Sequence, residues 1–278
     1  MKTILIPTED HDAMPAVLEA ATMMARMFDS YMEGFAVRPS AGTYVTVEPV
    51  SSLAISGAYD GDAPRRARSE FVEFMQRSGV GEAVGRQQTA SLSYGWPMAE
   101  AADDIFIGSY GRVFDLIVLG RPGRAPENPR MPPLEAALFE SGKPVLIVPG
   151  QAPKIMGKNV LVAWNGSTEQ AHTNSYALDL LRRAEQVTVL TVEGSFTPGP
   201  TGEEAARHLC RNGVKARELT VKPDGRNAGE VILEQAAALD CDLLVKSAYT
   251  QSRLRQMIFG GATRHILANA SLPVLMAH

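Results

Sequence analysis

The sequence predicts an α/β protein built from two doubly wound parallel sheets in tandem. Short runs rich in Val, Ile and Leu alternate with segments whose apolar residues recur at helical spacing. The runs are continuous, which is typical of parallel strands covered by helices on both faces. They also occur twice: MKTILIP matches KNVLVAW, FDLIVLG matches CDLLVKS, and GKPVLIVPG matches SLPVLMAH. A repeated strand–helix alternation indicates two α/β domains.

In the first half, residues 1–150, five strands are expected to alternate with four helices. Val17, Ala21 and Phe28 share one face of the first helix. Pro144 opens the last strand, where a missing N–H group is tolerated. The expected strands are 3–7, 31–37, 89–94, 115–120 and 144–148, and the expected helices are 12–28, 62–78, 97–111 and 132–141.

The second half, residues 157–278, repeats this order, and the linker between the halves lies within 149–157. Ala171 and Leu178 share a helical face, and Pro273 opens the last strand as Pro144 does. The expected strands are 158–164, 186–193, 214–221, 242–247 and 273–277. The expected helices are 168–184, 201–212, 226–239 and 261–270.

Matched segments lie further apart in the first half, which therefore holds extra residues before its fourth strand. We place them at 39–61, a stretch of small and loop-forming residues after the second strand. Ligands bind at this carboxyl edge of a parallel sheet. The segment is interpreted either as a lid over a ligand or as a tolerated insertion.

Bulk properties narrow the function classes. The chain has 278 residues, 45% hydrophobic and 21% charged, and a net charge of −4. This charge gives no basic face for nucleic acid, and no apolar stretch reaches the length of a membrane span. The N-terminus lacks a signal-peptide pattern, so we expect a cytoplasmic protein.

The order of these segments resembles a tandem universal stress protein, with two similar domains in one chain. The resemblance is strongest over 158–193 and 226–278, which contain VLVAWNGSTEQA, DLLVKS and the closing PVLM. It implies a Rossmann-like sheet of five strands in the order 3-2-1-4-5 in each half. It also implies a pseudo-dimer within the chain, in which the fifth strands, or the surfaces beside them, meet. A ligand would lie outside strands 1 and 4, where the chain direction reverses.

Nucleotide-binding members hold adenosine with an Asp after strand 1 and with backbone after strand 2, and hold phosphates with a G-x2-G-x9-G-[ST] loop. Main-chain amides and a helix start suit such oxyanions. In the second half, Asn165 replaces the Asp, and Ser247 and Thr250 replace the first two glycines. Trp164 either stacks on a base or fills the interface between sheet and helices. The candidate ligand-binding residues in this half are Trp164, Asn165, Val192, Ser247, Thr250, Ser252, Arg253, Gly260 and Gly261.

The first half departs from this loop pattern at its other end. Gly120 and Gly123 supply the first two glycines, but the proline-rich segment PENPRMPP replaces the rest. The candidate ligand-binding residues here are Pro7, Glu9, Val37, Gly120 and Gly123. The acidic run Glu9-Asp10-His11-Asp12 is read either as a metal or acid–base cluster or, the reading we favour, as a helix cap by Asp10 or Asp12.

These observations predict a non-catalytic stress-response protein that binds a small molecule, with an adenine nucleotide or another small anion in the second half. The nucleotide would be ATP or AMP, with Mg²⁺ if it is ATP, and the first half would be structural or regulatory. No motif for a nucleophile or a metal site is recognised. Two alternatives stay open: a weak ATPase or nucleotide-dependent transferase, and a ligand-free scaffold for a protein partner. Association of two chains into a homodimer is also left open.

Overall fold

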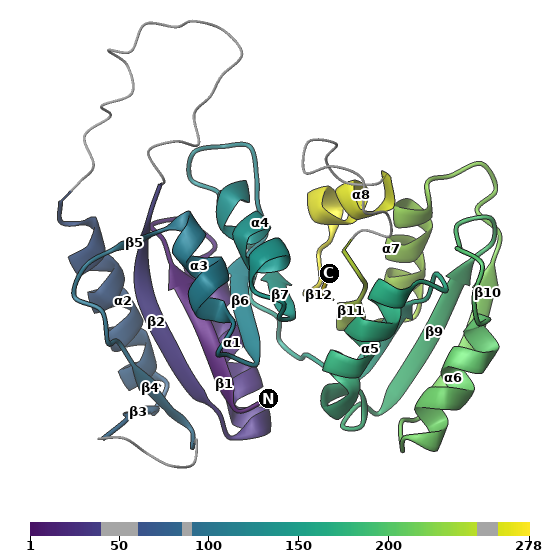
Figure 1. Cartoon of the computed structure of the whole chain (residues 1–278), viewed down its shortest axis with the longest axis horizontal. Coiled ribbons are helices and arrows are strands. Elements are labelled where there is room, and N and C mark those ends of the chain that lie inside the picture. The colour runs from purple at the N-terminus through teal and green to yellow at the C-terminus, as the bar shows by residue number, and fades with distance from the viewer. Residues whose placement is uncertain (40–60, 85–90, 249–260) are drawn as a thin grey trace, which may run out of the picture.

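The computed structural model describes residues 1–39, 61–84, 91–248 and 261–278 (Figure 1). We call residues 1–150 half one and residues 157–278 half two. The strands of half one are β1 (Thr3–Thr8), β2 (Tyr31–Arg38), β3 (Gly81–Glu82), β4 (Ser93–Gly95), β5 (Ala102–Asp103), β6 (Leu116–Gly120) and β7 (Val145–Val148). Its helices are α1 (Met14–Phe28), α2 (Ala63–Arg77), α3 (Asp104–Gly111) and α4 (Met131–Glu140).

Half two repeats the alternation of strands and helices. Its strands are β8 (Asn159–Ala163), β9 (Gln186–Val192), β10 (Ala216–Val221), β11 (Leu243–Val245) and β12 (Val274–Met276). Its helices are α5 (Thr168–Leu181), α6 (Gly202–Arg211), α7 (Ala228–Ala238) and α8 (Gly261–Asn269).

Both halves have the predicted strand order. The main path through the sheet is β10-β9-β8-β11-β12-β7-β6-β1-β2-β4-β3, with β5 paired to β2. Within each half the paired strands are parallel, and the five main strands follow the order 3-2-1-4-5. This confirms the predicted fold class. It also places the ends of strands 1 and 4 side by side in each half, as a ligand crevice requires.

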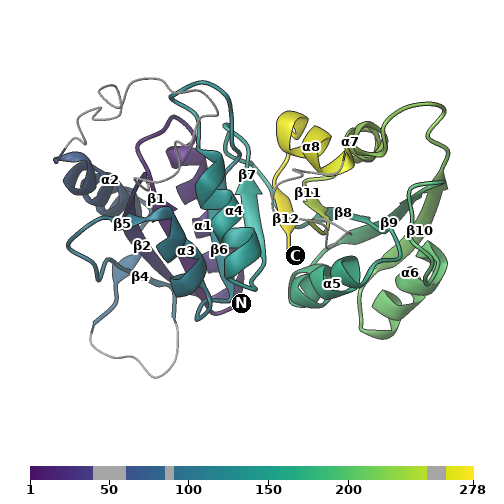
Figure 2. The ribbon, with the colours of Figure 1, turned by 45° about the horizontal axis from the view of Figure 1, so that its top comes forward.

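The two halves meet through their fifth strands, as the resemblance implied. β7 and β12 pair antiparallel, with Leu146 opposite Leu275, and join the two sheets into one, which has twelve strands within the described residues. The two strands lie next to each other in the middle of the molecule in both views (Figures 1 and 2). Pairing removes two strand edges that would otherwise present free N–H and C=O groups.

The hydrophobic core lies on both faces of this continuous sheet. One cluster packs α1, α2, α5 and α6 against one face, and the other packs α3, α4, α7 and α8 against the opposite face. Successive strand residues alternate between them, so that Ile4 and Ile6 belong to the first cluster and Leu5 to the second. Each cluster contains residues of both halves, so the halves share their cores as well as their sheet.

The prediction of a helix over 97–111 is wrong at its start, because α3 begins at Asp104. The Asp103 side chain accepts a hydrogen bond from the backbone N–H of Phe106 at 3.0 Å, which caps the helix there. The residues before it instead form β5, which pairs with β2. The strand expected at 89–94 is seen as β4, and residues 85–90 lie outside the described part of the chain.

The predicted cap of α1 by Asp10 or Asp12 is also wrong. The N-cap residue is Ala13, which makes no side-chain cap hydrogen bond, and Pro15 occupies the first turn. Proline fits this turn because it has no N–H group that needs a partner. Ser167, in contrast, caps α5 by accepting a hydrogen bond from the Gln170 N–H group at 3.1 Å.

Among the described residues, no helix combines the length and the apolar character that crossing a membrane requires.

Candidate ligand-binding site

The crevice of half one is filled by the chain's own residues. Gly120 ends β6 and is buried, and a Cβ atom on it would lie 2.5 Å from Cγ of Pro129. The Gly123 N–H group donates to the Pro129 carbonyl at 3.1 Å, and the Arg121 N–H group donates to the Val148 carbonyl at 2.7 Å. The amides that the loop pattern would offer to a phosphate are therefore engaged within the protein.

Arg130 occupies the strand-1 side of the same crevice. Its Nε donates to Glu9 at 2.7 Å, and its two terminal nitrogens donate to the Asp104 carboxylate at 2.6 and 3.1 Å. Both carboxylate side chains are almost completely buried. Burial raises the pKa of Glu9, and the Arg130 guanidinium opposes this rise. The acid predicted to contact a ligand is thus paired with an arginine of the same half.

The remaining candidates of half one are apolar residues of β1 and β2. Pro7 lies in β1 and is buried, whereas Val37 lies near the end of β2 and is half-buried. The inserted segment falls mainly in residues 40–60, which are outside the described chain.

In half two, a loop packs against the turn that follows β8. The Thr197 N–H group and hydroxyl donate to the Asn165 carbonyl at 2.9 and 3.1 Å. A Cβ atom on Gly199 would lie 2.5 Å from the Gly166 carbonyl oxygen, so loop and turn are in close contact. The Asn165 side-chain oxygen accepts from the Ser167 N–H group at 3.2 Å. Asn165 therefore shapes the turn into α5, and residues 194–200 border the region predicted for adenosine.

Trp164 lies under this loop. It is 8% exposed, belongs to the core cluster of α5 and α6, and donates from Nε1 to the Pro200 carbonyl at 2.8 Å. Trp164 therefore packs between the sheet and its helices, and its stacking on a base stays a prediction. Val192, at the end of β9, is buried, and its carbonyl accepts from the Ser195 N–H group at 3.1 Å.

Ser247 follows β11, at the position of the first glycine in the loop pattern. It is fully buried, and its N–H group donates to Gln170 Oε1 at 2.7 Å. Its hydroxyl has no hydrogen-bond partner among the described residues. Gly261 is the first residue of α8, and a Cβ atom on it would lie 2.8 Å from Asn227 Nδ2. The candidates Thr250, Ser252, Arg253 and Gly260 lie outside the described residues.

Lys246 is a residue at this site that the sequence analysis missed. It ends the apolar run DLLVK and is 8% exposed. Its ammonium group donates to the Ser247 carbonyl at 2.9 Å and to the Thr263 hydroxyl at 3.3 Å, in the first turn of α8. The signal that could have revealed it is a lysine at the carboxyl end of a strand that is otherwise apolar, because buried lysines are rare.

The comparison with family models identifies half two. Residues 156–278 match the model of the universal stress protein family. The chain contains a universal stress protein domain. The loop-covered turn at Asn165, the buried Lys246 and the α8 amino end all belong to this domain. No curated protein matches the chain by sequence.

Solved structures resemble the whole chain, including half one. A universal stress protein from Archaeoglobus fulgidus DSM 4304 is 13% identical with a TM-score of 0.72, over 99% of this chain and 95% of that one. A functionally unknown protein from Pseudomonas aeruginosa PAO1 is 17% identical with a TM-score of 0.55, over 100% and 92%. At these identities the likeness shows the fold alone, and it extends over both halves of the chain.

The buried lysine of the universal stress protein domain leads to a prediction about stability. Burial lowers the pKa of Lys246 from its usual 10.5 to about 8. The unfolded chain therefore binds more protons between these two values, and the free energy of unfolding rises with pH across this window. We expect Lys246→Met to increase stability by about 3 kcal/mol at pH 7 and to remove this rise. Urea unfolding of both proteins from pH 7 to pH 10 measures it, and a stability difference that does not change with pH would contradict it.

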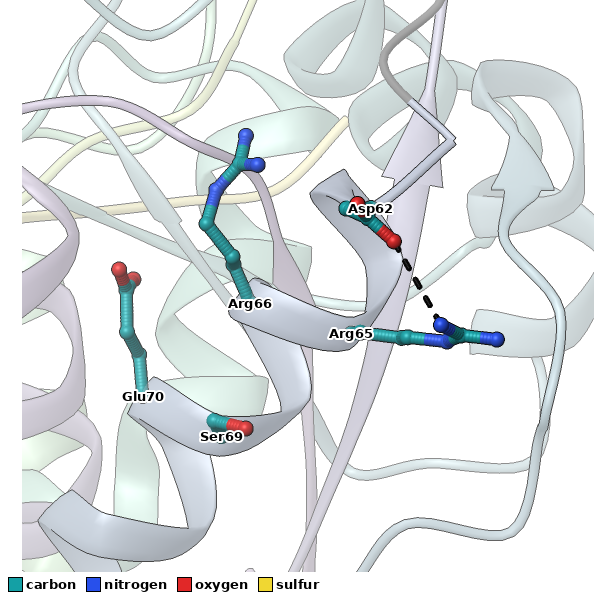
Figure 3. Close-up of a pocket in the computed structure, with 5 residues that line it drawn as sticks. All are labelled: Asp62, Arg65, Arg66, Ser69 and Glu70. Carbon is teal, nitrogen blue, oxygen red and sulfur yellow. Dashed lines mark ion pairs between the residues drawn. The ribbon is translucent and has the colours of Figure 1, made fainter.

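The described residues also outline a depression on α2, away from the universal stress protein domain. Asp62, Arg65, Arg66, Ser69 and Glu70 line a volume of about 340 Å³ (Figure 3). All five residues are exposed, and the Asp62–Arg65 ion pair at 3.5 Å is open to solvent. Such a surface lacks the apolar enclosure of a small-molecule site. No group of metal-ligating side chains occurs within the described part of the chain.

Proposed function

We propose that the chain is a non-catalytic, stress-responsive binding protein that holds an adenine nucleotide in half two. The observation that carries this proposal is the contrast between the two crevices. In half one, Arg130 neutralises the strand-1 acid, and the Pro129 carbonyl takes the turn amide of Gly123. In half two, Lys246 and the amino end of α8 leave an electropositive region, which favours phosphate groups.

The proposal assigns different parts of half two to different parts of the ligand. The phosphate groups would lie at the amino end of α8, beside Gly261. The adenosine would lie against residues 194–200 and the backbone after β9, because Trp164 is covered by this loop. Half one would serve as the structural partner, joined to half two through the antiparallel pair of β7 and β12. A cytoplasmic location and a homodimer remain predictions of the same account.

Two other functions lead to different results in the same assay. A weak ATPase or transferase would show Mg²⁺-dependent release of ADP, whereas a binding protein would hold ATP without turnover. A ligand-free scaffold would bind neither ATP nor AMP.

The test is calorimetric titration of the full chain with ATP and AMP, followed by an ADP-release assay with Mg²⁺. We expect binding without turnover. Gly261→Val places a branched side chain at the first residue of α8 and against Asn227, so we expect at least tenfold weaker binding. Gly81→Val is the matched control, because a Cβ atom at Gly81 meets nothing within 4 Å. Absence of heat with both nucleotides would overturn the nucleotide proposal.

A further inference from the structure

The ammonium group of Lys246 is buried without a charged partner in the described structure. An ammonium group has three N–H donors. Two of them have acceptors, the Ser247 carbonyl at 2.9 Å and the Thr263 hydroxyl at 3.3 Å, and both acceptors are uncharged. A buried charge is normally paired, because its transfer from water is costly. One N–H bond and the whole positive charge are therefore left for another group.

The surroundings of Lys246 add to the positive electrostatic potential at its ammonium group. Thr263 lies in the first turn of α8, whose amino end carries a partial positive charge from the helix dipole. The Asn227 Nδ2 donor lies beside Gly261 at the same helix end. The buried hydroxyl of Ser247, the next residue, lacks a partner among the described residues.

No ion pair joins Lys246 to a charged group among the described residues, and α5, on the other face of the sheet, carries Glu169, His172 and Asp179. The charged or titratable residues of α8 are Arg264 and His265, and those of α7 are Glu230 and Glu234. β8 and β12 carry none. Burial is the cause of the lowered pKa of Lys246. The segment 249–260 contains no Asp or Glu in its sequence.

We propose that Lys246 is the charged group of an anion site at the amino end of α8, and that this site takes the phosphate or sulfate group of a small ligand. The proposal rests on the proposed function in placing the ligand in half two. The anion site goes beyond the proposed function because it assigns the electrostatic attraction to one side chain. The loop pattern of the family relies on glycine amides instead. An anion beside Nζ offsets both the buried charge and the helix dipole, and it accepts the third N–H bond.

The test measures binding of sodium sulfate and of ATP to the full chain by calorimetry at pH 7.0, 8.0 and 9.5. We expect Lys246→Met to weaken both ligands at least tenfold at pH 7.0. Lys215→Met removes the same charge from an exposed position at the opposite edge of the sheet, and its affinities should equal those of the wild type. Thr263→Val, which keeps the lysine, should weaken binding less than Lys246→Met does. Urea unfolding confirms that each variant is folded.

Proton uptake gives a second readout that a purely structural lysine would not produce. At pH 8.0 about half of the Lys246 side chains are neutral, and an anion that binds the charged form draws protons onto them. We expect uptake of about half a proton per anion bound, measured in two buffers of different ionisation enthalpy, and no uptake in Lys246→Met.

The outcomes separate this inference from the proposed function. Sulfate binding that depends on Lys246, without ATP binding, supports the anion site and contradicts the nucleotide. ATP binding that is equal in wild type and Lys246→Met overturns the anion site and leaves the nucleotide proposal standing. Absence of binding of both anions to the wild type overturns both.

Discussion

Leu275→Asp is expected to lower the free energy of unfolding by at least about 4 kcal/mol. Leu275 is fully buried in β12, opposite Leu146 of β7, at the seam where the two sheets join. The substitution removes a buried side chain and places a carboxylate without a partner in an apolar core that both halves share. Few single substitutions in the chain should lower the free energy of unfolding by as much.

The same variant tests whether the two halves unfold together. The chain has two tryptophans, Trp96 in half one and Trp164 in half two. With 5-fluorotryptophan, each half gives its own ¹⁹F NMR signal during urea unfolding. We expect one shared transition in the wild type, because sheet and cores are continuous, and two separate transitions in Leu275→Asp. Phe196→Asp, at a residue that is 59% exposed, is the control and should change stability little. Separate transitions in the wild type would contradict a coupled seam.

Arg130→Met is expected to lower the free energy of unfolding by about 3 to 5 kcal/mol at pH 7, because it leaves two buried carboxylates without a cationic partner. Arg130 donates to both Glu9 and Asp104, whose side chains are 10% and 4% exposed. Loss of the guanidinium removes the charge that lowers the pKa of Glu9 in the folded protein. The loss in free energy of unfolding should therefore shrink as the pH falls and the Glu9 carboxyl group of the variant becomes protonated.

Arg66→Met provides the comparison for this variant. Arg66 forms an ion pair with Asp10 at 3.4 Å, and both side chains are largely exposed. Exposed pairs of this kind contribute less than about 1 kcal/mol. Urea unfolding of both variants at pH 7 and pH 5 measures the difference. Equal losses of unfolding free energy in the two variants would contradict the role given to Arg130. A loss of unfolding free energy in Arg130→Met that grows as the pH falls would contradict it as well.

The fold was largely predictable because both halves show the same strong periodic signal. Continuous apolar strands such as ILIP and LIVLG define a parallel sheet covered on both faces, and their repetition predicts the second domain. The two-residue strands β3 and β5 were not predictable, since so short a segment has no periodicity. The start of α3 was missed for a local reason, because the capping side chain of Asp103 ends the preceding strand and begins the helix.

The site was less predictable because its decisive contacts join distant parts of the chain. The loop pattern located Gly120, and the position after the first strand located Glu9. Their partners Pro129 and Arg130 come from a proline-rich segment whose path depends on tertiary packing. Lys246 was visible in the sequence as an interruption of an apolar run. Its significance comes from burial beneath α8, which no local pattern encodes.

The central claim is that this chain has one working crevice and one that its own residues close. Native mass spectrometry of the full chain, titrated with ATP, counts the ligands directly. The account predicts one ATP per chain at saturation, bound in the universal stress protein domain. Two ATP molecules per chain would contradict the closure of half one by Arg130, and none would contradict nucleotide binding in half two.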